Sequence, residues 1–300
     1  DGDIDYIAGN TGQNSFYRPT DKYPVKVYAK DFDNNGIYDA LISTYLPASG
    51  EDTARKEFPA NMRDDEIKQM IEFRRKFPTY KSYAKATMDS LLTPDELNGA
   101  LVLSASNFKS CFIRNDGNGQ FSMVPLPAQA QFSSLFGMVA EDVDGDGNLD
   151  VVITGNDYGT DVSVGRYDAL NGLVLKGDGK GGFTPLSILQ SGIFIPGNGK
   201  ALVKLSNNKG QCLLAASQNR GPLKMFLLKE SMQKLPVKAD DIYGILTLKN
   251  GHKRKVELNY GAGFLSQSAR FLNIDAAVQA VEIVNARGDK RAVAIPTGAK

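Results

Sequence analysis

The chain has 300 residues, 42% of them hydrophobic, which is enough for one large or two medium domains with a substantial core. Its 35 basic and 34 acidic residues leave a formal net charge of +1, so charge gives no support for a nucleic-acid partner or an anionic membrane surface. The two cysteines are too few for a disulfide framework, and no apolar run approaches the roughly 18 to 20 residues of a membrane span. We therefore expect no nucleic-acid partner and no membrane span in this chain.

The first ten residues read as part of an acidic loop that leads into a short strand. Their sequence, DGDIDYIAGN, aligns with DGNLDVVITGN at residues 146–156. Both place an aspartate before a glycine, a second aspartate before an apolar run, and a Gly-Asn pair after that run. Because the alignment starts in the middle of the longer loop, we expect the chain to be a fragment of a longer protein.

Another copy of the acidic loop lies at residues 31–44, DFDNNGIYDALIST. Its acidic and amide side chains stand at the same offsets as those of residues 142–150, and an apolar strand again follows. Three copies with one internal spacing indicate a repeat architecture.

Residues 62–92 have a helical pattern inside an otherwise strand-rich sequence. Apolar residues recur at helical spacing from Ile67 to Ile71 and from Tyr80 to Leu91, and Pro78 separates the two groups. We predict two helices in an insertion at about residues 50–98.

Two hairpins and one degenerate unit complete the repeats. FIRNDGNGQFSMVPL (residues 112–126) and VLKGDGKGGFTPLSI (residues 174–188) each read as strand, glycine-rich turn, strand. Residues 200–226 keep two strand patterns but have Asn-Asn-Lys-Gly in place of the acidic loop, so we expect no metal in that unit. Short strands and glycine-rich turns in units of this kind predict an all-β fold of the β-propeller type.

The acidic loops have the composition of a site for one hard cation. Carboxylates at alternate positions, a glycine at the sixth position and a carboxylate at the ninth can wrap oxygen atoms round an ion, and the seventh residue offers its carbonyl. Ligands that are all oxygen favour Ca²⁺ over zinc or copper. An EF-hand is excluded because it needs a glutamate at the twelfth position, where one copy has Ile42 and another has Ile153. Polar turns between strands are the alternative interpretation of these loops. The predicted ligands are Asp142, Asp144, Asp146, Asn148 and Asp150 in one loop, Asp31, Asp33, Asn35, Ile37 and Asp39 in a second, and Asp1, Asp3 and Asp5 in a third.

Residues 135–155, LFGMVAEDVDGDGNLDVVITG, resemble an FG-GAP/VCBS repeat, the calcium-loop blade of integrin-α-like β-propellers. They carry the Phe136-Gly137 pair and the complete acidic loop. The resemblance implies propeller blades over residues 1–230 and a seven-bladed propeller. Because 230 residues are too few for seven blades, we expect this chain to hold the C-terminal blades and a missing N-terminal part to supply the remaining ones.

Residues 231–300 are predicted to form a small β domain. Apolar and polar residues alternate over residues 240–295, and ILTLKNGHKRKVEL reads as a hairpin with an Asn250-Gly251 turn. Residues 260–274, YGAGFLSQSARFLNI, resemble the ASPIC/UnbV domain, which is often found after such propellers.

Polar residues gather where the strands after the acidic loops end. Because these strands are equivalent, the segments that follow them should emerge at one rim, opposite the calcium loops. Amides, guanidinium groups and tyrosines suit a glycan or protein ligand. Asparagines at strand ends also occur in turns, and the Arg-Tyr-Asp cluster at residues 166–168 could instead stabilise its own loop through a salt bridge. The predicted rim residues are Asn10, Asn14, Arg18, Asn156, Tyr158, Arg166, Tyr167, Asp168, Asn219 and Arg220.

No catalytic motif stands out in the sequence. The only histidine, His252, lies beside a hairpin turn, and no nucleophile elbow, Cys-His pairing, phosphate loop or zinc spacing occurs. We expect a calcium-stabilised binding or adhesion scaffold. The alternative is a carbohydrate-active enzyme that uses the rim carboxylates Asp157, Asp161 and Asp168. Exposed calcium loops of this kind fill at millimolar calcium, which together with the resemblance predicts an extracytoplasmic location, in the periplasm or at the cell surface of a bacterium.

Overall fold

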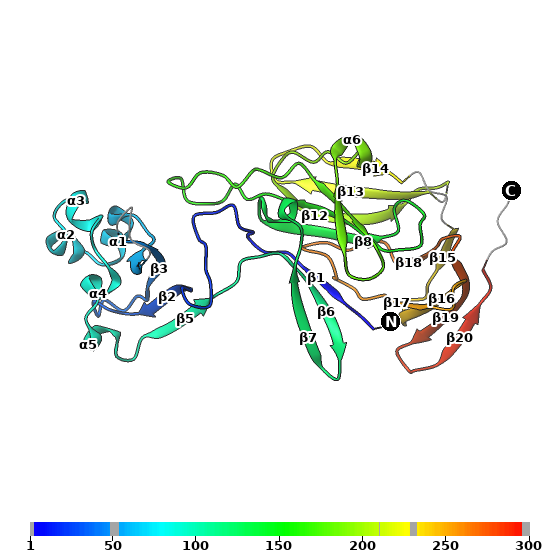
Figure 1. Cartoon of the computed structure of the whole chain (residues 1–300), viewed down its shortest axis with the longest axis horizontal. Coiled ribbons are helices and arrows are strands. Elements are labelled where there is room, and N and C mark those ends of the chain that lie inside the picture. Colours follow the sequence, from blue (N-terminus) through cyan, green and yellow to red (C-terminus); the bar gives the residue numbers. More distant parts are fainter. Residues whose placement is uncertain (1–2, 49–53, 210, 229–232, 296–300) are drawn as a thin grey trace. The chain divides into compact units, whose positions relative to one another are not determined.

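The computed structural model describes residues 3–48, 54–209, 211–228 and 233–295. In this part of the chain the secondary structure is mostly β, in small antiparallel sheets, none of which closes on itself. The all-β prediction is therefore confirmed at the level of fold class. The chain divides into two compact units, a smaller unit of residues Phe16–Phe108 and a larger unit of residues Asp1–Ser15 and Lys109–Lys300 (Figure 1).

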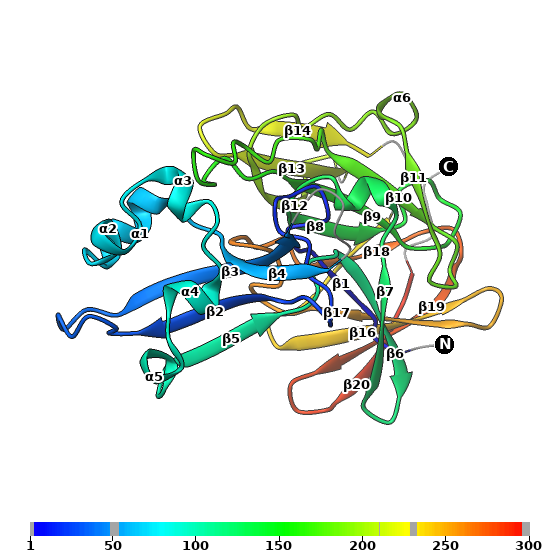
Figure 2. The same cartoon turned by 60° about the vertical axis from the view of Figure 1, so that its left-hand side comes forward.

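The smaller unit is a four-stranded antiparallel sheet with a set of short helices (Figure 2). Its strands run in the order β4-β3-β2-β5, where β2 is Val25–Lys30, β3 is Asp39–Pro47, β4 is Arg55–Pro59 and β5 is Leu101–Ala105. The helices lie between β4 and β5 in the chain and are α1 (Arg63–Gln69), α2 (Phe73–Lys76), α3 (Tyr80–Tyr83), α4 (Met88–Leu91) and α5 (Pro94–Leu97).

The helices pack against this sheet through a shared apolar core. Tyr28 and Leu41 from the sheet lie in one buried cluster with Met70, Phe73 and Leu91 from the helical segment. Helices therefore lie on both sides of Pro78, but residues 62–92 form four short helices, α1 to α4, instead of the two that the sequence predicts. The chain turns between them, and α3 and α5 each begin with a threonine capping box.

Three sheets of the larger unit are built from the repeated sequences. Strands β8 (Leu135–Glu141), β9 (Asp150–Gly155), β10 (Leu173–Gly177) and β11 (Phe183–Leu186) form a meander in the order β11-β10-β9-β8. The second sheet is β1-β6-β7, with β1 at Tyr6–Ala8, β6 at Cys111–Gly117 and β7 at Gln120–Pro125; the third is β12-β13-β14, with β12 at Gly199–Ser206, β13 at Cys212–Gln218 and β14 at Lys224–Leu227. The two predicted hairpins are confirmed as β6-β7 and β10-β11. A 3₁₀ turn (Ala128–Gln131) precedes β8, and α6 (Ile188–Ser191) follows β11.

Strand β1 pairs with β6 although the smaller unit separates them in the sequence. Ile7 lies opposite Phe112 in an antiparallel register. The smaller unit is therefore inserted between two paired strands of the larger one. The acidic loop at residues 31–39 belongs to this insertion, where it joins β2 to β3.

A glycine lets two sheets of the larger unit approach closely. A Cβ atom at Gly137 would lie 2.8 Å from the carbonyl carbon of Ala201, closer than side chains tolerate. Val139 and Leu202 share a buried cluster that joins β8 to β12, and a second cluster around Phe112 joins β6 to β9 and β10. The sheets that follow one another along the chain therefore pack through common cores.

The segment after residue 233 adds two further sheets to the larger unit. Strand β15 (Gln233–Pro236) pairs with β18 (Phe271–Ile274), while β16 (Asp241–Leu248), β17 (Lys253–Glu257), β19 (Val278–Asn285) and β20 (Lys290–Val293) form a sheet in the order β17-β16-β19-β20. Leu246, Leu272 and Ile283 lie at the centre of their core. The hairpin predicted with an Asn250-Gly251 turn is confirmed as β16-β17, and Gly251 has φ +84°.

Candidate functional site

Two acidic loops each connect a pair of neighbouring antiparallel strands. Residues 142–150, the first loop, join β8 to β9, and residues 31–39, the second loop, join β2 to β3. In each loop, three carboxylates offer one oxygen each that lies within 4.8 Å of the other two; they are Asp142, Asp144 and Asp146 in the first loop, and Asp31, Asp33 and Asp39 in the second. Oxygens that lie this close together can share one Ca²⁺ at its usual metal–oxygen distance of about 2.3–2.6 Å.

The two loops share one pattern of hydrogen bonds. In each, the first carboxylate accepts from the glycine at the sixth position, and the ninth-position carboxylate accepts from the second residue of the loop. The equal spacing in the sequence thus corresponds to the same pair of hydrogen bonds, although the third carboxylate of the cluster is Asp146 in the first loop and Asp39 in the second. The matched pairs, donor first, are Gly147 N with Asp142 Oδ2 (2.9 Å), Gly36 N with Asp31 Oδ2 (2.8 Å), Val143 N with Asp150 Oδ2 (2.9 Å) and Phe32 N with Asp39 Oδ2 (3.0 Å).

The ninth-position carboxylates are buried and surrounded by other acids. Asp150 is fully buried and Asp39 is 2% exposed. Burial raises the pKa of both carboxyls above the ordinary value, and the neighbouring aspartates of each loop act in the same direction. A divalent cation at the centre of each loop would reverse this effect, since it favours the ionised carboxylates.

Lys176, on β10, brings a positive charge to the first loop. Its ammonium group pairs with Asp144 and lies 3.0 Å from Asp146 Oδ2. Burial alone would raise the pKa of Asp146, but the Asn148 N–H bond and the pairing with Lys176 outweigh burial and lower it. No lysine or arginine in the described part of the chain forms an ion pair with the second loop, so the two loops differ in their charge balance.

The structure describes only part of the third predicted loop, because Asp1 lies outside the described residues. Its last carboxylate, Asp5, accepts a hydrogen bond from a main-chain N–H at the position equivalent to the one that Asp150, the last carboxylate of the first loop, accepts from. Asp5 Oδ1 accepts from Asn115 N on β6 at 2.8 Å, and Asp150 Oδ1 accepts from Gly177 N on β10 at 2.9 Å. Asp5 is thus the structural counterpart of Asp150, while Asp3 lies in the preceding bend.

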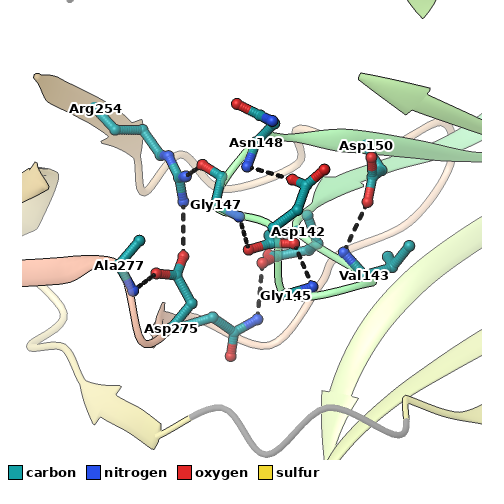
Figure 3. A network of polar contacts seen from close by, with 12 residues as sticks. Asp142, Val143, Gly145, Gly147, Asn148, Asp150, Arg254, Asp275 and Ala277 are labelled. Atoms are coloured by element: carbon teal, nitrogen blue, oxygen red, sulfur yellow. Dashed lines mark hydrogen bonds and ion pairs between the residues drawn. The ribbon is translucent and has the colours of Figure 1, made fainter. Parts of the chain in front are cut away.

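The first loop also contacts the C-terminal sheet, as Figure 3 shows. Arg254, on β17, donates to the carbonyl of Gly147 and pairs with Asp275 Oδ2 at 3.2 Å. Asp275 in turn accepts from Ala277 N at 2.7 Å. Arg254 and Asp275 have no signal in the sequence that marks them for this site, because neither belongs to a local motif and both lie far from the loop in the chain.

Nine of the ten predicted rim residues belong to the larger unit, at the ends of β1, β9 and β13 or in the segments that follow. Leu135 N, at the start of β8, donates to the Asn10 carbonyl at 3.0 Å, and Asn156 N donates to the Ser134 carbonyl at 2.9 Å. The structure therefore brings Asn10 and Asn156 together at the start of β8, while Asn219 and Arg220 follow β13 and are exposed. The tenth residue, Arg18, is exposed in the smaller unit.

Asn156 is a buried structural residue at this rim. Its backbone has φ +84°, and its side-chain nitrogen donates to the carbonyls of Leu170 at 2.7 Å and Gly197 at 2.9 Å. Its side-chain oxygen accepts from Leu170 N at 3.0 Å. Because the residue is fully buried, its amide joins segments of main chain and presents no surface to a ligand.

The loop between Asp157 and Asp168 is closed on itself. Asp157 and Tyr167 exchange two main-chain hydrogen bonds of 2.8 Å each, and the Arg166 guanidinium lies 4.8 Å from the centre of the Tyr158 ring. Asp157 also lies 3.6 Å from the ammonium of Lys200. Arg166 and Tyr158 thus contact each other, and Asp168 remains exposed beside them.

A pocket of about 430 Å³ lies at the same rim. The Phe132 ring is 44% exposed, and Asn14 Nδ2 donates to the Phe132 carbonyl at 3.2 Å. Gln131 is buried and its amide is already bonded to the main chain of Ser110 and Leu126. Sequence reasoning found Asn14 but missed Gln13 and Phe132, which stand in no periodic pattern. The pocket is lined by Gln13, Asn14, Ala128, Gln131, Phe132 and Ala169.

The chain matches no protein-family model, and a search of curated proteins found no relative. Among the described helices, none combines the length and the apolar character needed to cross a membrane.

Proposed function

We propose that this chain is a calcium-stabilised binding scaffold, made of FG-GAP/VCBS-type propeller blades and an ASPIC/UnbV-like β domain, and that it binds a glycan at the rim pocket. The observation that carries the ligand proposal is the pocket of about 430 Å³, in which an exposed phenylalanine ring lies beside two amide side chains.

The chemistry of this pocket fits a sugar. Pyranose rings have an apolar C–H face and a surrounding edge of hydroxyl groups. The exposed ring of Phe132 offers a flat apolar surface, and the amides of Gln13 and Asn14 offer both donors and acceptors. Among the described residues, no charged side chain lines the pocket, which favours a neutral sugar over an acidic one. The volume falls within the range of about 300–1,000 Å³ that is common for ligand pockets.

The acidic loops have a structural role in this proposal. The first loop lies at the other end of β9, the strand that leads to the rim, and the second loop has the equivalent place between two strands of the smaller unit. A bound Ca²⁺ would balance the negative charge of the carboxylates in each loop. Asp142, Asp144, Asp146, Asp150 and the Asn148 carbonyl would hold it in the first loop. In the second loop, Asp31, Asp33, Asn35, Asp39 and the Ile37 carbonyl would do so. Because such loops fill at millimolar calcium, an extracytoplasmic location, in the periplasm or at the surface of a bacterium, follows from the same proposal.

The arrangement of the sheets supports the propeller part of the proposal. The sheets β1-β6-β7, β8 to β11 and β12 to β14 follow one another along the chain and pack through common clusters. These three sheets are fewer than the seven blades that the proposal needs, and the remaining blades would come from polypeptide on the N-terminal side of this chain.

A glycan panel probed with the full chain tests the ligand. We expect Phe132→Ala to weaken binding at least about tenfold, since stacking on an aromatic ring and its apolar burial are lost together. Phe121→Ala is the matched control, because Phe121 is 52% exposed on β7 and does not line the pocket. Equal loss in both variants, or no binding to any glycan, would contradict the proposal. Release of reducing sugar in the same samples would instead support the enzyme alternative.

A further inference from the structure

Strand β1 has a partner on one edge only. It pairs with β6, and within residues 3–48, 54–209, 211–228 and 233–295 no strand pairs with its other edge. Its counterpart β9 lies between two strands, β8 and β10. Since Asp5 and Asp150 make the same contact with the strand that follows, β1-β6-β7 corresponds to β9-β10-β11 and lacks the counterpart of β8.

A cleft of about 420 Å³ lies beside β1, inside the larger unit. Residues 4–7 form one side, and Phe136, Met138 and Ala140 of β8 form another. Residues 254–257 line it from the C-terminal sheet. The space between β1 and β8 is therefore open where the missing strand would run.

The packing of β8 shows how such a strand is held. Val139 lies on one face of β8 and packs with Leu202 of β12, which Gly137 allows to come close. Phe136 and Met138 lie on the other face, where they line the cleft and remain only partly buried. A strand beside β1 would cover this second face as β12 covers the first.

The cleft also holds polar groups that need partners. The side-chain oxygen of Asn273, which lines the cleft, is buried without a hydrogen-bond partner. In the described part of the chain, no strand pairs with the main-chain groups of β1 that point away from β6. An extended polypeptide is the ligand that satisfies a row of main-chain donors and acceptors along a sheet edge.

We propose that this cleft is the binding site of an antiparallel β-strand of the β8 type, supplied by polypeptide on the N-terminal side of residue 1. By the register of β8 with β9, the counterparts of Ala140, Val139 and Met138 lie opposite Tyr6, Ile7 and Ala8. A short acidic loop joins the two strands, which gives a strand of the same chain a high effective concentration at the β1 edge. The inference rests on the repeat architecture proposed above and not on the glycan pocket.

The test adds a copy of the chain's own strand β8 before residue 1. The segment SSLFGMVAEDVDG, residues 133–145, joined directly before Asp1, restores a whole strand and a whole acidic loop. Tyr6→Trp adds a reporter, since the chain has no tryptophan and Tyr6 is 49% exposed in the cleft. We expect the tryptophan emission to shift to shorter wavelength and the amides of β1 that are not bonded to β6 to exchange about tenfold more slowly.

The matched control carries proline in place of the copied Met138, because proline cannot donate to a ladder and breaks the pairing. It should behave as the unextended chain. Emission and exchange that are the same with and without the proline would overturn the proposal, and so would a dimer in light scattering, which would mean that the strand pairs between molecules.

A peptide titration covers the case in which the extended chain does not fold. Synthetic SSLFGMVAE is added to the unextended Tyr6→Trp chain, whose fold is checked by circular dichroism. A saturable shift of the emission supports the proposal, and no shift up to millimolar peptide overturns it. Glycan binding by the same proteins is a separate readout, so its failure would contradict the proposed ligand and leave the strand site standing.

Discussion

The ammonium group of Lys176 lies 3.0 Å from Asp146 Oδ2 and also pairs with Asp144, so a side chain of β10 neutralises part of the first acidic loop. Hydrogen bonds to these two carboxylates raise the pKa of Lys176 above its ordinary value, and the lysine stays protonated at neutral pH. The second loop has the same hydrogen bonds but no paired lysine in the described residues. A cation that enters the first loop must therefore compete with an internal one.

Lys176→Met should raise the affinity of the first loop for Ca²⁺ about two- to fivefold, the size of effect typical of partly exposed ion pairs. Isothermal titration with calcium measures it, and high salt should reduce the difference because it screens the lysine. Lys180→Met is the control, since Lys180 is exposed in the turn of the same hairpin and pairs with neither Asp144 nor Asp146. An unchanged affinity in Lys176→Met would show that the lysine does not compete.

Calcium removal should lower the thermal stability of the full chain. Excess EDTA is expected to reduce the unfolding midpoint, and millimolar calcium should restore it, because a ligand bound only by the folded state stabilises that state by mass action. Asp146→Asn and Asp33→Asn should each remove part of the calcium-dependent rise, and Asp95→Asn, on the exposed surface of α5, should not. Midpoints that are the same in EDTA and in calcium would rule out both loops as calcium sites.

Gly137→Ala should destabilise the larger unit by about 1–3 kcal/mol, the usual cost of overpacking. The new methyl group would meet main-chain atoms of Ala201 and Leu202, which cannot move aside as a flexible side chain could. Urea unfolding followed by circular dichroism measures the loss. Gly159→Ala is the control, because the nearest atom to a Cβ there is 3.4 Å away and its φ is not positive. Equal stability of the two variants would mean that β8 and β12 can separate without cost.

The parts of this fold that the sequence predicts are those with local signals. The spacing of the aspartates and the glycine-rich turns define the acidic loops and the hairpins because every residue of those motifs contacts its near neighbours. The pairing of Ile7 with Phe112 across the whole smaller unit has no such signal, since it depends on contacts between segments far apart in the chain. For this reason the insertion of residues 16–108 between two paired strands is visible only in the structure.

The candidate rim shows the same limit at the level of single residues. Asn156 stands in a Gly-Asn pair, which is typical of an exposed turn, yet carbonyls of Leu170 and Gly197 hold it in a fully buried position. Phe132 has no pattern that marks it for a site, and only the fold places its ring beside Asn14.

Glu66, on α1, is a buried acid of the smaller unit. It is fully buried. Burial raises the pKa of this carboxyl from 4.5 to about 7, and contact with the Asn61 side chain opposes part of that rise. Because the folded-state pKa lies above the unfolded one, the neutral carboxyl keeps its full contribution to stability below about pH 4.5, and that contribution is lost as the pH rises through about 7.

Glu66→Gln should therefore remove a pH dependence rather than shift the stability uniformly. Between pH 5 and pH 8 we expect the unchanged chain to lose about 2–3 kcal/mol of unfolding free energy relative to the variant, since one pKa unit corresponds to about 1.4 kcal/mol. Urea unfolding of the full chain at the two pH values measures the difference. Glu72→Gln is the control, because Glu72 is exposed just before α2 and should follow the pH profile of the unchanged chain. If Glu66→Gln and Glu72→Gln give parallel profiles, Glu66 is not the group that links folding of this helical core to pH.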